Sequence, residues 1–118
     1  MSVMSHPLAE GQPVVPLPER DPAALRKAVA RLDPAALSKF EADWTAATAR
    51  ARDEYSLLPA RHFVEHWFTW VAVQRWPQLA GRLRACERVV AESQDHAERR
   101  AAAAEISQIL RQGDITTA

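Results

Sequence analysis

Glycine is almost absent from this chain, and its scarcity constrains the fold more than any other feature. The 118 residues contain three glycines, Gly11, Gly81 and Gly113. No Asn-Gly or Asp-Gly pair joins two alternating apolar runs, so the tight turns of β-hairpins lack the residues that favour them. Alanine, the best helix former, is abundant instead. The sequence therefore predicts an all-α fold without a sheet.

Charge and cysteine content narrow the functions that such a chain can serve. Fifteen Lys and Arg balance fifteen Asp and Glu, so no overall field attracts nucleic acid or an anionic membrane. The single cysteine excludes an internal disulfide and the multi-cysteine zinc patterns, and it favours a reducing cytoplasm. No run approaches the roughly 20 apolar residues of a membrane span. We expect a cytoplasmic protein with no membrane contact and no cofactor.

Prolines and acidic caps mark the first elements. Five of the eight prolines fall in the first 22 residues, where hydrophobic periodicity is absent, so residues 1–20 are predicted to form a flexible arm. The sequence DPAAL occurs at residues 21–25 and again at 33–37, each time with an acidic N-cap and a proline at the first helical position. Two helices are predicted to start there. The second carries an apolar stripe at three- and four-residue steps, formed by Leu37, Phe40, Trp44, Ala47, Ala51, Tyr55 and Leu58.

Three more helices are expected after Pro59. The third is the most apolar and ends at Trp76-Pro77, with one face formed by Phe63, Val64, Trp67, Phe68, Trp70 and Val71. The fourth places Cys86 on its buried face. Asp95 and Glu98 have capping-box spacing and start the fifth, which Gly113 ends. Whether the fourth and fifth helices form one rod stays open.

These elements predict one domain over residues 21–113, followed by a flexible tail over 114–118. Short connections between helices favour antiparallel neighbours. We therefore expect four or five helices in an antiparallel bundle around the third helix, which is rich in Trp and Phe and lies at the centre of the core.

The sharpest chemical motif is residues 62–66, HFVEH, which match H-x-x-E-H. In that pattern two histidines one helical turn apart hold zinc and the glutamate acts as a base. Here the histidines are His62 and His66, and Glu98 or Glu105 would supply a third ligand. A domain of this size cannot build the substrate chamber of such enzymes. We expect no enzyme, and His62 and His66 stay weak metal candidates beside the alternative of a solvated helix face.

A basic segment and one tryptophan suggest a binding surface. Between residues 75 and 88, four arginines against one glutamate give a local charge of +3. Arg84 and Arg88 share an exposed face that would contact phosphates or an acidic partner. Trp76 projects away from the apolar stripe of the third helix, and tryptophan is enriched at interface hot spots. The candidate partner-binding residues are Trp76, Arg75, Arg84 and Arg88.

Several short motifs, in this order, resemble an actinobacterial family of small helical proteins of unknown function. They are LPERDPAA at 17–24, FEADW at 40–44, LP at 58–59, EHW at 65–67 and ILRQGD at 109–114. Members of that family are often encoded beside RelE/ParE-like toxins, so the resemblance implies an antitoxin-like role and supplies no catalytic residue. We expect a non-enzymatic protein-interaction domain. The alternative is a nucleic-acid-binding regulator that uses residues 75–88, and a homodimer is left open.

Overall fold

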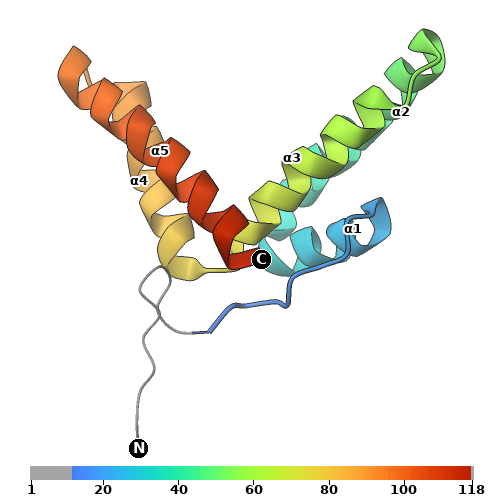
Figure 1. Cartoon of the computed structure of the whole chain (residues 1–118), viewed down its shortest axis with the longest axis horizontal. Helices are drawn as coiled ribbons and strands as arrows, with labels where there is room; N and C mark the ends of the chain where they lie inside the picture. The colour runs from blue at the N-terminus through green and yellow to red at the C-terminus, as the bar shows by residue number, and fades with distance from the viewer. Residues whose placement is uncertain (1–11, 118) are drawn as a thin grey trace, which may run out of the picture. The chain divides into compact units, whose positions relative to one another are not determined.

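The computed structural model describes residues 12–117. Within them no strand occurs, which confirms the predicted all-α fold, and five α-helices form where four or five were predicted. None of these helices combines the length and apolar character that a membrane span requires. The elements, in chain order (Figure 1), are α1 (Pro22–Leu32), the 3-10 turn η1 (Pro34–Ala36), α2 (Leu37–Glu54), α3 (Leu58–Gln74), α4 (Pro77–Glu92) and α5 (His96–Thr117).

The described residues form two compact units, each with its own hydrophobic cluster. The α1–α3 unit comprises residues 15–71, and the α4–α5 unit comprises residues 12–14 and 72–117 of the described chain. The predicted extent of the domain, residues 21–113, stays a prediction.

The two DPAAL repeats start helices, because each aspartate accepts a hydrogen bond from an early backbone amide. Asp21 Oδ1 accepts from Ala24 N at 2.8 Å, the bond expected of an N-cap, and α1 follows. Asp33 Oδ1 accepts from Ala35 N at 3.1 Å, one residue closer, and the chain first forms the 3-10 turn η1. The second α-helix therefore begins at Leu37, three residues later than the repeat predicts.

Aromatic residues of α3 form the core of the α1–α3 unit, as predicted. Phe63, Trp67 and Phe68 are buried there. The ring of Phe40 in α2 meets Phe63 and Trp67 edge-on, with centroids 5.0 and 5.1 Å apart. Truncation of one such buried aromatic side chain to alanine typically costs about 3–5 kcal/mol. These aromatic contacts between α2 and α3 therefore stabilise this unit.

The proline-rich segment before α1 packs against this core from residue 15 onward. Val15 is buried in the cluster, and Leu17 packs against it. The guanidinium carbon of Arg20 lies 4.0 Å from the centroid of the Phe68 ring, a cation–π contact. This part of the predicted arm is therefore held on the helices, while residues 1–11 lie outside the described residues.

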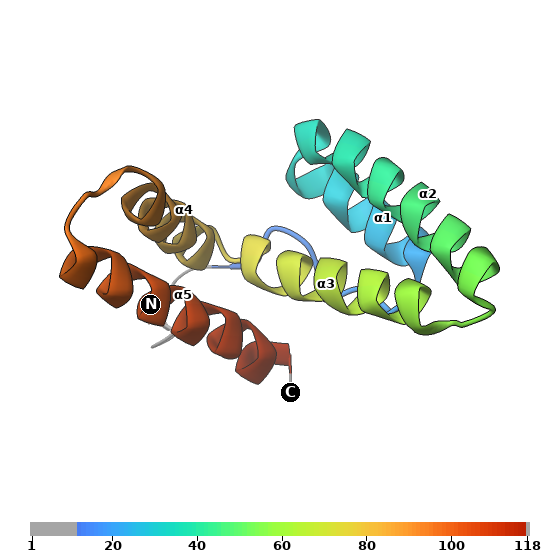
Figure 2. The same ribbon diagram turned by 90° about the horizontal axis from the view of Figure 1, so that it is seen from above.

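Helices α4 and α5 are separate, which answers the question that the sequence left open. They lie side by side, joined by residues 93–95 (Figure 2). Asp95 Oδ1 accepts from Ala97 N at 2.9 Å and from Glu98 N at 3.3 Å, so Asp95 caps α5 as predicted. The Glu98 carboxylate accepts from Ser93 Oγ. The Asp95 backbone N–H donates to Ser93 Oγ at 3.1 Å, so Ser93 accepts the hydrogen bond that Glu98 would accept in a capping box.

Gly113 does not end α5, contrary to the prediction. The helix continues to Thr117, so the predicted tail over residues 114–118 is helical up to that residue, and residue 118 lies outside the described chain. A Cβ atom added at Gly113 would lie 2.9 Å from Val73 Cγ2. The glycine therefore permits a close approach within the α4–α5 unit instead of serving as a C-cap.

Candidate functional site

The turn between α2 and α3 contains an unusual backbone conformation. Tyr55 has φ 52° and ψ 45°, and among the described residues it is the only non-glycine with a positive φ. Ser56 N donates to Ala51 O at 3.0 Å and Tyr55 N donates to Arg52 O at 3.4 Å, the pair of bonds of a Schellman motif. Glycine usually occupies this position, because the left-handed region costs a residue with a Cβ about 1–2 kcal/mol. Local backbone energetics therefore do not select tyrosine here.

Three apolar side chains at this turn extend into solvent. Tyr55 is 96% exposed, Leu57 74% and Leu58 50%. We call these three residues the hairpin tip. The backbone beneath them is ordered, because Ser56 Oγ accepts from Leu58 N at 3.1 Å at the start of α3. Several large apolar side chains exposed close together on a hydrogen-bonded turn are typical of an interaction site.

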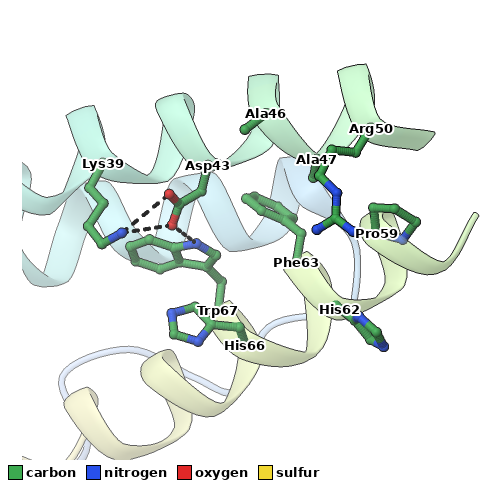
Figure 3. Close-up of a pocket in the computed structure, with 10 residues that line it drawn as sticks. All are labelled: Lys39, Asp43, Ala46, Ala47, Arg50, Pro59, His62, Phe63, His66 and Trp67. Carbon is green, nitrogen blue, oxygen red and sulfur yellow. Dashed lines mark hydrogen bonds and ion pairs between the residues drawn. The ribbon is translucent and has the colours of Figure 1, made fainter. Parts of the chain in front are cut away.

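A groove of about 350 Å³ runs between α2 and α3 (Figure 3). In it, Trp67 Nε1 donates to Asp43 Oδ2 at 3.1 Å, and Lys39 Nζ lies 3.2 Å from the same oxygen. The carboxylate thus satisfies a buried indole and faces a cation. Because Asp43 is on α2 and Trp67 is on α3, this hydrogen bond helps to hold the two helices together. The lining residues are Lys39, Asp43, Ala46, Ala47 and Arg50 of α2 with Pro59, His62, Phe63, His66 and Trp67 of α3.

The two histidines of the HFVEH motif lie exposed on α3 and line this groove. The His66 ring meets Trp67 edge-on, with centroids 5.5 Å apart. No cluster of three His, Cys, Asp or Glu side chains suited to a metal ion occurs within residues 12–117. The proposed third ligands are engaged elsewhere, since Glu105 pairs with Arg82 at 3.0 Å and Glu98 accepts from Ser93. A three-ligand zinc site is therefore not assembled by these residues.

Two of the four predicted partner-binding residues are buried, although the helical projection places Trp76 away from the apolar stripe. Trp76 and Arg75 are each 7% exposed, and Trp76 belongs to the core of the α4–α5 unit. Burial lowers the pKa of the Arg75 guanidinium. The helical projection fails because α3 ends at Gln74, and Trp76 has the extended backbone of the N-cap before Pro77. Beyond the helix end, the angle of 100° per residue no longer applies.

The other two predicted residues, Arg84 and Arg88, are exposed on α4 as expected. Arg75 is buried and the exposed Arg82 is paired with Glu105, so two exposed arginines of the +3 segment have no ion pair among the described residues. Two cations one helical turn apart make a narrow phosphate-binding surface. The nucleic-acid alternative stays a prediction that rests on these two side chains.

Cys86 is buried in the α4–α5 core, as its helical position predicts. Burial raises the pKa of its thiol, and the charge of Glu105 and a hydrogen bond to it raise this pKa further. A thiol with a raised pKa holds little thiolate at neutral pH. These surroundings favour a packing role for Cys86.

Sequence reasoning missed the hairpin tip, because Tyr55 and Leu58 continue the apolar spacing of the second helix. The structure ends α2 at Glu54, and both side chains leave the face on which Phe40 and Ala47 are buried. A usable signal was Ser56 three residues before Pro59, since a short hydroxyl residue and a proline together favour a turn.

Comparison with known proteins supplies a family for this fold. No curated protein and no solved structure matches the chain. One family model matches residues 13–115, which cover the end of the proline-rich segment and all five helices up to the last turn of α5. The resemblance to a domain of unknown function is thereby confirmed, and the chain belongs to the family of unknown function DUF6247.

Proposed function

We propose that this chain is a non-enzymatic protein-interaction domain whose hairpin tip docks on a small toxin-like protein and masks it. The observation that carries the proposal is the exposure of Tyr55, Leu57 and Leu58. Covering one large apolar side chain yields about 1.5–3 kcal/mol. A partner surface with a matching apolar hollow would recover that free energy at three neighbouring positions.

The backbone at the tip supports a protein as the partner. Tyr55 is held by the two hydrogen bonds of the Schellman turn, so its Cα position is fixed before binding. Tyrosine has two χ angles and gives a large contact area at low entropic cost, and it is enriched at protein interfaces. A preformed turn that presents a tyrosine therefore suits protein recognition.

Two exposed carboxylates beside the tip offer contacts to a basic partner. Asp53 and Glu54 are exposed and directly precede Tyr55. Glu54 pairs with Arg50 at 3.1 Å, and Asp53 forms no ion pair with any described residue. The identity of the partner as a toxin rests on the resemblance to a family whose genes often lie beside those of RelE/ParE-like toxins. The implied gene context and the exposed tip together support an antitoxin-like role.

The test is co-expression with the product of the adjacent gene. We expect rescue of growth and a stable complex on size-exclusion chromatography. Leu57→Ser should weaken the complex about tenfold to a hundredfold, because about 1.5–3 kcal/mol of apolar burial is lost. Val14→Ser is the matched control, since Val14 is also exposed, at 46%, but lies away from the tip in sequence. The absence of both rescue and complex would overturn the proposal.

A second variant separates binding from folding. Tyr55→Gly relieves the left-handed strain, so the free energy of unfolding should rise by about 1 kcal/mol while partner binding falls. A tyrosine that served the fold alone would show the opposite change in stability. Unchanged binding by a correctly folded Tyr55→Gly variant would remove the tip from the interface.

A further inference from the structure

A second groove lies on the α1–α3 unit, between the proline-rich segment and α1, and has a volume of about 620 Å³. Val15, Pro16 and Pro18 line it from the extended segment. Across from them α1 contributes Ala24 and Ala28, four residues apart on one helix face. Because both are alanines, a bound chain could approach the helix backbone closely.

The groove is preformed and largely apolar. Val15 and Ala28 are buried in the core of the unit, which fixes the floor. Pro16 and Pro18 lack backbone N–H groups, so this wall offers no amide donors at those positions. A ligand therefore gains from apolar contact with the floor and wall and must find its polar partners at the rim.

The rim carries cations and no acidic side chain. Arg26, Lys27 and Arg31 line the groove, and neither Asp nor Glu does. Arg26 is engaged, because its Nε and Nη2 both donate to Glu41 Oε2 at 2.9 and 2.6 Å. Lys27 and Arg31 are exposed and lie one helical turn apart on α1. Neither forms an ion pair with any described residue. Like charges at this spacing repel each other, so an anion placed between them is stabilising.

This combination distinguishes an acidic polypeptide from a nucleic acid. Single-stranded nucleic acid is bound by stacking its bases on aromatic rings along a basic track. No aromatic side chain lines this groove, and only two of its cations are available. Carboxylates next to apolar side chains match both the rim and the floor.

We propose that this groove binds a short acidic polypeptide segment, with its carboxylates on Lys27 and Arg31 and an apolar side chain on the floor formed by Val15 and Ala28. The proposal is independent of the hairpin tip and of the toxin-like partner. It adds a second recognition surface, specific for acidic and apolar sequence, to the same unit.

The experiment uses the full chain and a fluorescein-labelled peptide of glutamate and leucine, with fluorescence anisotropy as the readout. We expect saturable binding that weakens as salt rises, because exposed ion pairs are screened. Reversal of both cations in Lys27→Glu/Arg31→Glu should weaken binding at least tenfold. Arg52→Glu is the matched control, since Arg52 is an exposed arginine on α2 that does not line the groove, and it should bind like wild type.

Two further measurements distinguish the apolar contribution of the groove from that of its cations. Ala24→Phe fills the apolar channel and leaves both cations in place, so binding should fall while the helical circular dichroism spectrum is retained. Leu57→Ser at the hairpin tip should leave peptide binding unchanged. The proposal is overturned if the glutamine version of the peptide binds as tightly, if a single-stranded oligonucleotide binds more tightly than the peptide, or if no saturable binding occurs.

Discussion

Replacing the two helical glycines of the α4–α5 unit by alanine should change its stability in opposite directions. Gly81 lies in α4, and a Cβ added there meets no atom within 4 Å. Alanine is favoured over glycine in a helix interior by about 0.8–1 kcal/mol. Gly81→Ala should therefore raise the free energy of unfolding by about 1 kcal/mol.

Gly113→Ala adds the same methyl group to a filled site. Its Cβ would lie 2.9 Å from Val73 Cγ2 and 3.7 Å from Ala72 Cβ. Carbon atoms attract each other best at about 3.5–4.0 Å, so the first contact is repulsive. Val73 is fully buried and β-branched, and it cannot rotate away without a cost. Overpacking of this kind costs about 1–3 kcal/mol, which exceeds the gain in helix propensity of at most about 1 kcal/mol.

Urea titration followed by far-UV circular dichroism measures both changes. We expect Gly113→Ala to unfold at lower urea than wild type and Gly81→Ala at higher urea, with similar m-values. The double variant Val73→Ala/Gly113→Ala should show a favourable coupling of about 1 kcal/mol relative to the two single changes, because the smaller side chain makes room for the methyl group. If Gly113→Ala stabilised the protein as much as Gly81→Ala, the close contact with Val73 would be refuted.

Three further predictions concern single side chains. Asp43→Ala deprives the buried Trp67 Nε1 of its acceptor and should lower the free energy of unfolding in urea by about 1–3 kcal/mol, whereas Asp43→Asn keeps an acceptor and should lose less; equal losses would contradict the role of this bond. Asp21→Ala removes the acceptor of Ala24 N and should cost about 1 kcal/mol in thermal unfolding, and an unchanged melting temperature would count against the cap. Burial raises the pKa of the Cys86 thiol in the folded state, so its contribution to stability is complete below the unfolded-state pKa and is lost as pH rises through the folded-state pKa. As pH rises above the unfolded-state thiol pKa of about 8.5, wild type should thus lose more stability than Cys86→Ala, and parallel curves would exclude this linkage.

Features that depend on neighbouring residues in the chain were predictable from the sequence. The aspartates of the two DPAAL repeats accept hydrogen bonds from amides two or three residues later, so the helix starts follow from local chemistry. The apolar face of α3 is equally local, because its periodicity holds along one straight helix. Phe63, Trp67 and Phe68 are accordingly buried as predicted.

Features that depend on contacts distant in sequence were not predictable in this way. Gly113 has the sequence context of a C-cap, and only its 2.9 Å approach to Val73 shows why a glycine lies inside a continuing helix. Contacts distant in sequence also decide which arginines of residues 75–88 form an ion pair. Arg82 finds Glu105 on α5, a partner 23 residues away, while Arg84 and Arg88 stay exposed.

Periodicity also misplaced side chains at helix ends, and this explains why the candidate surface lies at a turn. A projection of 100° per residue assumes that the axis continues, but α2 ends at Glu54 and α3 at Gln74. Past the first end, the positive φ of Tyr55 reverses the chain and leaves this side chain in solvent, although the projection would bury it. Past the second end, Trp76 is buried in the core of the α4–α5 unit, although the projection would expose it. The strongest aromatic candidate for a partner contact is therefore Tyr55 and not Trp76, because Tyr55 is almost fully exposed at a strained backbone position, and such positions cluster at functional sites.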